Sequence, residues 1–184
     1  MLQQTQVSPV VPYYLEFLAR FPSLAVLAEA RVEAVLAAWS GLGYYRRARY
    51  LHAAARRIRS ELGGKMPRDF DSLLSLPGIG RYTAGALASI AFDNPQPALD
   101  GNAQRVLARL LLVRGDVESS RVRRRFERTV LAMMQACRPA EVTQGLMELG
   151  ALLCAPVDPA CTLSPLARHC VACSAGMQNS LWEG

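Results

Sequence analysis

The residues best suited to chemistry are a glycine-rich turn and a carboxylate that follows it. The turn is Leu76-Pro77-Gly78-Ile79-Gly80-Arg81, and a Pro-rich loop after it ends in Asp100-Gly101-Asn102. Glycines lack a Cβ, so the backbone N–H groups beside them can meet a phosphate oxygen or a phosphate-bridging cation. The carboxylate of Asp100 can stabilise positive charge that develops on a sugar. Together the two segments are suited to chemistry at a sugar carbon next to a phosphate.

Asp100 and Asn102 also have an ordinary structural interpretation. Aspartate directly before a helix is a favoured N-cap, because its oxygen accepts backbone N–H bonds from the first turn. Asn102, two residues later, is also common at a helix start. The roles are compatible, since a capping bond favours the ionised form of a carboxylate. We therefore expect Asp100 to cap a helix and to remain ionised for catalysis.

The elements that position these residues are all expected to be helices. Apolar residues recur every three to four positions, and no segment alternates as a half-buried strand does. Turns at Phe21-Pro22, Gly41-Leu42-Gly43, Gly63-Gly64 and Asn94-Pro95 separate the helices. The fold class is predicted as all-α, with helices over 10–20, 23–29, 31–39, 44–62, 69–75, 81–92, 102–112, 119–136 and 139–153.

Charge and hydropathy indicate the kind of partner and the compartment. The net charge of +6 and the pI of about 9.4 favour a polyanionic partner. The sequence has neither a long uncharged apolar run nor a secretory leader, so we expect an intracellular, cytoplasmic protein without a membrane span. One arginine cluster is expected to be a solvated helix face: Arg121, Arg123, Arg124, Arg125 and Arg128. The other is either a solvated face or a phosphate-binding surface: Arg46, Arg47, Arg49, Arg56, Arg57 and Arg59.

Three motifs occur in an order that resembles one protein family. They are Met1-Leu2-Gln3-Gln4-Thr5-Gln6, then Gly41-Leu42-Gly43-Tyr44-Tyr45, then the glycine hairpin with Asp100. With the cysteines near the end, they resemble the helix-hairpin-helix–GPD superfamily of base-excision DNA glycosylases, and within it the MutY-like adenine glycosylases. The resemblance covers almost the whole chain. It implies a glycosylase core of two helical lobes, which we place at 1–115 and 116–184, with DNA lying across the groove between them.

The resemblance implies how the reaction is divided among three side chains. Asp100 stabilises the oxocarbenium-like sugar of the transition state, and Asn102 and Tyr82 assist it. In endonuclease III-like relatives a lysine at position 82 forms a Schiff base, which leads to cleavage at the abasic site. This chain has Tyr82 there, and its single lysine, Lys65, lies elsewhere. We therefore expect a monofunctional glycosylase.

DNA contacts are implied for residues of all three motifs. A glycosylase takes its target base out of the stack, and a flat amide or an apolar side chain can fill the vacated space. The ordinary alternatives are an exposed glutamine for Gln4 and a half-buried core position for Tyr44 or Tyr45. The implied DNA-binding residues are Gln4, Leu42, Tyr44, Gly78, Gly80 and Arg81.

The chain departs from the family pattern at both ends. MutY-like proteins place the general acid, a glutamate, two residues before the Met-Leu-Gln-Gln-Thr-Gln motif, and here that motif begins the chain. They also continue past the cysteines into a Nudix-like domain that helps to recognise 8-oxoguanine. We therefore expect a chain truncated at both ends, with impaired base release and a weakened preference for 8-oxoguanine.

The cysteines match the family's cluster motif at three of its four positions. The family holds a [4Fe–4S] cluster with the spacing C-x6-C-x2-C-x5-C. The residues of this chain in that register are Cys154, Cys161, Ser164 and Cys170. A serine oxygen is a poorer ligand than a thiolate, and Cys173 can replace it. Free thiols, or zinc with His169 nearby, are the alternatives. Cys137 is expected in the core. The expected ligands are Cys154, Cys161, Cys170 and Cys173.

The sequence thus predicts a DNA repair enzyme, monomeric and associated with the nucleoid. Its reaction is hydrolysis of the N-glycosidic bond of adenine mispaired with 8-oxoguanine or guanine in double-stranded DNA. The alternative is a catalytically silent module or fragment that binds mispairs. The missing glutamate favours the module, and Asp100, Asn102 and Tyr82 favour the enzyme.

Overall fold

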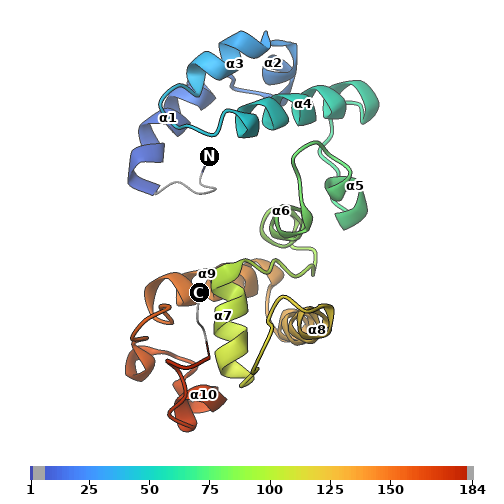
Figure 1. The fold of residues 1–184 in the computed structure, drawn as a ribbon. Coiled ribbons are helices and arrows are strands. Elements are labelled where there is room, and N and C mark those ends of the chain that lie inside the picture. The colour runs from blue at the N-terminus through green and yellow to red at the C-terminus, as the bar shows by residue number, and fades with distance from the viewer. Residues whose placement is uncertain (2–6, 182–184) are drawn as a thin grey trace. The chain divides into compact units, whose positions relative to one another are not determined.

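The structure is helical, and the all-α prediction is confirmed. A computed structural model describes Met1 and residues 7–181, and within them no strand occurs (Figure 1). A helix occurs at each predicted range, and one further short helix, α10 (Val171–Ser174), lies beyond them. The helices at the predicted ranges are α1 (Val7–Arg20), α2 (Leu24–Glu29), α3 (Val32–Ala38), α4 (Arg46–Glu61), α5 (Phe70–Leu74), α6 (Arg81–Ala86), α7 (Gly101–Leu110), α8 (Ser120–Ala136) and α9 (Pro139–Leu152).

Three short elements are not α-helical, and the first of them lies within the predicted helix 81–92. A π-helical turn, η1 (Leu87–Ala91), continues α6, and two 3₁₀ turns, η2 (Cys161–Leu163) and η3 (Ala167–His169), lie before α10. In η1, the buried Ser89 donates from Oγ to the Gly85 carbonyl at 2.8 Å and accepts from Thr143 Oγ1 at 2.9 Å. The hydrogen bond between Thr143 and Ser89 ties η1 to α9.

The chain divides into two compact units. Unit 1 is Met1–Pro67 with Ser75–Ile79, and unit 2 is Arg68–Leu74 with Gly80–Gly184. The predicted lobes, 1–115 and 116–184, have other boundaries than these units, and this division stays a prediction.

Unit 1 packs its helices around Trp39, at the end of α3. Trp39 is 1% exposed, lies edge-on to Phe17 with 5.9 Å between ring centroids, and donates from Nε1 to the Gly43 carbonyl at 3.2 Å. Arg47, in the first turn of α4, donates to the carbonyls of Leu42 and Gly43 and lies over the Trp39 ring. These contacts fix the Gly41–Tyr44 turn onto the core.

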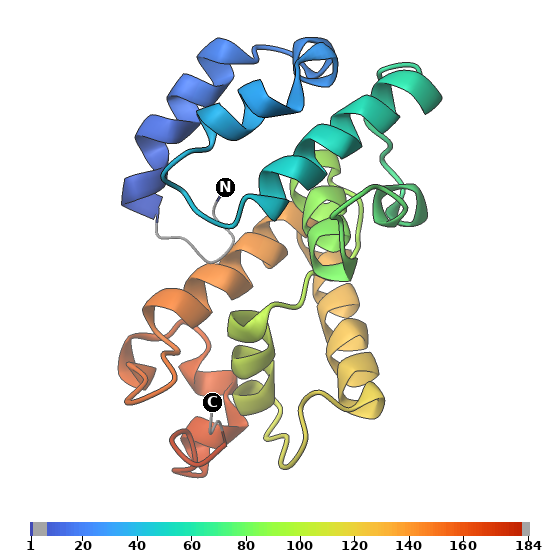
Figure 2. The same ribbon diagram turned by 45° about the horizontal axis from the view of Figure 1, so that its top comes forward.

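Unit 2 is built around α7, which lies between α8 and α9 (Figures 1 and 2). Apolar residues of all three helices form one cluster, with Leu107 of α7, Phe126 of α8 and Leu146 of α9 among its buried members. Seven of the ten residues of α7 are buried, so this helix is enclosed on most of its surface. A helix held this firmly gives Asp100, at its start, a fixed position.

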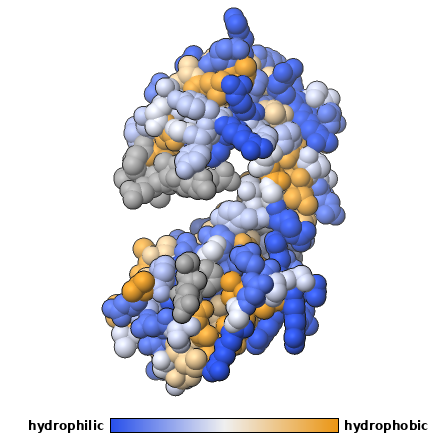
Figure 3. Space-filling view, viewed as in Figure 1, coloured by the Kyte–Doolittle hydropathy of each residue, from blue (hydrophilic) through white to orange (hydrophobic). Residues whose placement is uncertain are grey.

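The visible surface of both units is largely hydrophilic, with small apolar patches between charged side chains (Figure 3). Within the part of the chain that the structure describes, no helix has the length and apolar character needed to cross a bilayer.

Candidate active site

The glycine hairpin contains one position that requires glycine. Gly78 has a φ of +75°, and a Cβ there would collide with the side chain of Tyr50 on α4. Gly80 differs, since its φ of −88° suits any residue and nothing lies within 4 Å of where a Cβ would be. Gly80 is the N-cap of α6, so the missing side chain leaves the backbone of that turn open. The predicted contact between backbone N–H groups of the hairpin and a phosphate requires such an open backbone.

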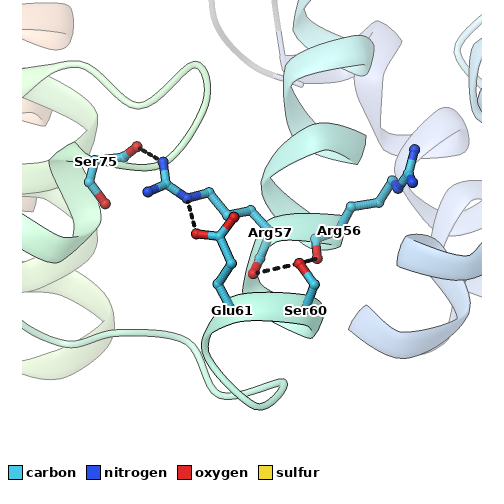
Figure 4. Close-up of polar contacts among 5 residues, drawn as sticks. All are labelled: Arg56, Arg57, Ser60, Glu61 and Ser75. Atoms are coloured by element: carbon cyan, nitrogen blue, oxygen red, sulfur yellow. Dashed lines mark hydrogen bonds and ion pairs between the residues drawn. The ribbon is translucent and has the colours of Figure 1, made fainter.

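An ion pair and a hydrogen bond secure the segment before the hairpin to α4. Arg57 donates from Nη1 to the Ser75 carbonyl at 2.6 Å and from Nε to Glu61 at 2.8 Å (Figure 4). Ser60 donates to the Arg56 carbonyl at 3.0 Å, while the guanidinium of Arg56 points away from this group (Figure 4). Arg57 therefore has a structural role, whereas Arg56 stays exposed.

Asp100 caps α7, as predicted from its position. Its Oδ1 accepts the Ala103 N–H at 2.7 Å, and its backbone is extended. Tyr82 of α6 lies near enough for the two side chains to interact. Burial raises the pKa of Tyr82 above its ordinary value of 10.0, and the charge of Asp100 raises it further. The phenol is a neutral hydroxyl at physiological pH, and it donates to the Met147 sulfur at 3.8 Å.

Asn102 is oriented by a buried arginine. Its Oδ1 accepts from Nη2 of Arg105 at 2.8 Å, so its amide NH₂ is left as a donor. Arg105 is 5% exposed and also donates to the carbonyls of Gly150 at 2.8 Å and Cys154 at 2.9 Å. Gly150 permits this close packing, because a Cβ there would lie 2.7 Å from the Cβ of Asn102. The N-terminal end of α7, which carries Asp100 and Asn102, is thus tied to the end of α9.

The cysteines of the C-terminal segment line one cavity in unit 2. Those that line it are Cys154, Cys161, Cys170 and Cys173, together with Ser164. Burial raises the pKa of the Cys161 thiol, and the neighbouring Cys173 thiol raises it further. His169 is exposed and is not part of this lining. Among the described residues, no three Cys, His, Asp or Glu side chains are grouped closely enough to hold a single metal ion.

A second buried arginine reaches the same cavity. Arg109 is 1% exposed, and its Nη1 lies 3.3 Å from the Cys154 sulfur and 2.6 Å from the Ala155 carbonyl. Its Nη2 donates to the Pro156 carbonyl at 2.7 Å. Arg109 therefore places a positive charge beside the thiols and holds the backbone that follows α9.

The residues with predicted wedge roles occupy different environments. Leu42 is 7% exposed and belongs to the core around Trp39, so its side chain is not at the surface. Tyr44 is 62% exposed, adopts a φ of 47°, and lies with its ring under the Arg47 guanidinium. Tyr45 is 43% exposed, which agrees with the half-buried alternative for one of these two tyrosines. Gln4 lies outside the described residues.

Arg81 begins α6 directly after the hairpin. It lies over the Phe70 ring, with 5.5 Å to the centroid, and its Nη2 is 3.8 Å from Glu127 of α8. Glu127 also pairs with Arg123 at 3.3 Å. A pocket in unit 2 brings these four side chains together with Tyr82. Arg81 is thus held near Tyr82 while its guanidinium remains partly exposed.

Comparison with known proteins decides the family. The model of the family described as "HhH-GPD superfamily base excision DNA repair protein" matches residues 1–131. The chain belongs to the HhH-GPD superfamily. A solved structure titled as a thermostable thymine-DNA glycosylase has the same fold, with a TM-score of 0.82 at 23% identity over 95% of this chain and 80% of that one.

Sequence relatives of this HhH-GPD chain include proteins named adenine DNA glycosylase. The protein of Mus musculus is 45% identical over 173 residues, which are 94% of this chain and 34% of the relative. The protein of Buchnera aphidicola subsp. Schizaphis graminum is 38% identical over 172 residues, which are 94% of this chain and 50% of the relative. The chain thus spans between a third and a half of the length of these relatives.

Sequence reasoning missed two buried arginines that support this site, and it misplaced Cys137, which lies outside the site. Arg105 and Arg109 lie four positions apart on a helix whose other inward residues are apolar, and that pattern could have shown that both are buried. Cys137 is exposed, so its expected core position is wrong. The reason is that α8 ends at Ala136 and Cys137 is the extended C-cap.

Proposed function

We propose that this chain carries the catalytic core of an adenine DNA glycosylase. Its reaction is hydrolysis of the N-glycosidic bond of adenine paired with 8-oxoguanine or guanine in double-stranded DNA. The observation that carries the proposal is the capped Asp100 at the start of α7, with Tyr82 and Asn102 beside it. The names of the relatives support adenine as the base that is removed.

Asp100 supplies the electrostatic part of the reaction. As the bond from the sugar to adenine lengthens, positive charge develops on the sugar ring. The capping bond uses Oδ1 of Asp100, so Oδ2 can approach this charge while the side chain keeps its position. A carboxylate that is already ordered requires little reorganisation as the charge forms.

Tyr82 and Asn102 act as neutral donors next to that carboxylate. Tyr82 keeps its proton at neutral pH, as a tyrosine of ordinary pKa also does, and can donate a hydrogen bond without adding a second negative charge. Asn102 offers its amide NH₂, since its oxygen is taken by Arg105. Adenine also needs a proton on a ring nitrogen to leave, and general acid catalysis of this kind contributes about 10²–10⁴-fold. The resemblance assigns that proton to the glutamate upstream of the Met1 motif.

Exposed arginines and the hairpin support double-stranded DNA as the partner. Arg49 and Arg56 are exposed on α4, and among the described residues their side chains have no polar partner. Gly80 leaves the backbone of its turn open, and Arg81 extends from the same turn. Tyr44, rather than the buried Leu42, is the described side chain best placed to wedge against a base pair.

The cysteine cavity fits an iron–sulfur cluster. Four thiols line it, and the buried cation of Arg109 lies 3.3 Å from the Cys154 sulfur, which suits an anionic thiolate group. We propose that the cavity holds a [4Fe–4S] cluster. When bound, the cluster would supply cross-links between the end of α9 and the η2–α10 segment. No step of base release requires it.

A single-turnover assay tests the proposed reaction. The 184-residue protein is mixed in excess with duplex DNA containing one A:8-oxoguanine pair, and alkali reveals abasic sites. We expect base release from A:8-oxoguanine and A:G duplexes and none from an A:T duplex. Without alkali, the strand should stay intact, because Tyr82 cannot form a Schiff base. Tight mispair binding without base release would contradict the proposal and support a silent binding module.

A further inference from the structure

One position of the cysteine cavity departs from the spacing that the family uses. In this chain the third position of C-x6-C-x2-C-x5-C is Ser164, and a further cysteine, Cys173, follows Cys170 after two residues. Both Ser164 and Cys173 line the cavity. The structure therefore offers two candidates for a fourth ligand, one hydroxyl and one thiol.

Ser164 already has a local structural role. Its Oγ accepts the Leu166 N–H at 3.2 Å, and its own N–H donates to the Cys161 carbonyl at 3.1 Å. These bonds close the turn that links η2 to η3. A hydroxyl used in this way stabilises the loop, and as a ligand it would be hard and poorly matched to iron in a sulfide cluster.

Cys173 is placed as a ligand by its helix. Cys170 is the N-cap of α10 and Cys173 lies one turn later, so both side chains lie on the same side of the helix. Cys173 of α10 lines the same cavity as Cys161, which belongs to a different element, η2. Ala172, between them, is fully buried, which fixes the rotation of α10. Cys173 therefore faces the other thiols.

We propose that Cys173, and not Ser164, provides the fourth thiolate of this cavity. The ligand set then reads C-x6-C-x8-C-x2-C, which moves the x2 pair from the second and third positions to the last two. The inference rests on the proposed cluster. It assigns the ligands Cys154, Cys161, Cys170 and Cys173, and leaves Ser164 as a turn-forming residue.

Iron and sulfide content of matched variants tests this assignment. The 184-residue protein is reconstituted anaerobically with ferrous iron and sulfide, and iron, acid-labile sulfide and visible absorption are measured per chain. Protection of each cysteine from alkylation, read by mass spectrometry, gives a second readout. The variants are Cys173→Ser, Ser164→Ala, the double variant Cys173→Ser with Ser164→Cys, and Cys137→Ser as the control outside the cavity. Circular dichroism reports whether each variant folds.

We expect about four irons and four sulfides per chain for the wild type. Cys173→Ser should lose the cluster, and Ser164→Ala and Cys137→Ser should retain it. The double variant, which restores the family register, should regain it, and this separates ligand loss from misfolding. Loss in Ser164→Ala with retention in Cys173→Ser would overturn the assignment. A wild type that takes up no iron and sulfide would overturn both the assignment and the cluster, whereas the base-release assay would still test the glycosylase separately.

Discussion

Helices α4 and α7 use arginine in opposite ways. On α4, Arg49 and Arg56 are exposed, and their side chains have no polar partner among the described residues. On α7, Arg105 and Arg109 are 5% and 1% exposed and donate to backbone carbonyls at the end of α9 and beyond it. Twenty of the 21 basic residues are arginine, so composition alone suggests a uniform polyanion-binding surface. The comparison shows that some of this charge holds the site together instead.

The difference has a physical origin in the guanidinium group. Its planar fork can satisfy several carbonyls at once, which a lysine ammonium does less well. The last carbonyls of a helix lack partners within the helix and carry partial negative charge, so they suit a buried cation. On α4, by contrast, the carbonyl-binding role is limited, among the described residues, to the two arginines that hold neighbouring turns: Arg47 donates to the carbonyls of Leu42 and Gly43, and Arg57 donates to that of Ser75. The function of an arginine therefore depends on whether its side chain is buried or exposed, and not on the number of arginines in the helix.

Arg109→Ala should have the largest effect on stability. The substitution leaves a void and removes the donors to the Ala155 and Pro156 carbonyls, so we expect the free energy of unfolding to fall by about 2–4 kcal/mol. Arg128→Ala, at an exposed site on α8, should change it by less than about 0.5 kcal/mol. Urea denaturation measures both. Equal small effects would show that the α7 arginines are not structural.

Arg105→Lys tests whether the buried Arg105 guanidinium also orients Asn102, the residue proposed to assist base release. Charge is kept but the three-way contact to Asn102, Gly150 and Cys154 cannot be reproduced, so we expect base release to slow about 10- to 100-fold. Single-turnover rates of Arg105→Lys, Asn102→Ala and the double variant form a cycle. If Arg105 acts through Asn102, the double variant should be no slower than Asn102→Ala; additive losses would exclude this coupling.

Arg49→Gln and Arg56→Gln should weaken DNA binding without changing stability. Each arginine that contacts a phosphate contributes about 0.9 to the slope of log affinity against log salt, so each substitution should reduce that slope by about 0.9. Arg59→Gln is the matched control, because Arg59 on the same helix is paired with Glu29 at 3.0 Å. Fluorescence anisotropy at several salt concentrations gives the slopes. An unchanged slope in both exposed variants would show that this face of α4 is only solvated.

The smallest predicted effect concerns Tyr82 at high pH. Because its pKa is raised in the folded state, the folded protein holds this proton more tightly than the unfolded chain does. The contribution is present below the unfolded pKa of about 10 and is lost as the pH rises through the folded pKa. Tyr82→Phe should therefore flatten the fall in thermal stability above about pH 10. Identical pH dependence in the two proteins would exclude a perturbed Tyr82.

The sequence predicted the helices and the cap well, because both depend on local patterns. Apolar spacing located α4, α8 and α9, and residue type alone identified Asp100 as an N-cap. The π-helical turn after α6 could not be predicted, since it depends on Ser89 meeting Thr143 of a distant helix. In the same way, nothing local in the Gly41–Tyr44 turn shows that Leu42 is buried and Tyr44 exposed.

In the cysteine segment, spacing in the sequence is not enough to assign the cluster ligands. Spacing alone places Ser164 at a ligand position, and only the tertiary arrangement shows its hydroxyl bound to the Leu166 N–H and Cys173 facing Cys161. Arg105 and Arg109 were missed because arginine is ordinarily an exposed residue. The roles of the site residues themselves stay predictions until they are tested.

The most direct measurement compares Asp100→Asn with Asp116→Asn in single-turnover base release from an A:8-oxoguanine duplex. Both aspartates accept one backbone N–H through Oδ1, Asp100 from Ala103 at 2.7 Å and Asp116 from Glu118 at 2.8 Å, and asparagine can keep either bond. The two variants therefore remove the same charge and differ only in place. We predict that Asp100→Asn slows base release about 10²–10³-fold, while Asp116→Asn stays at the wild-type rate. Equal rates in the two variants would contradict the central role of Asp100.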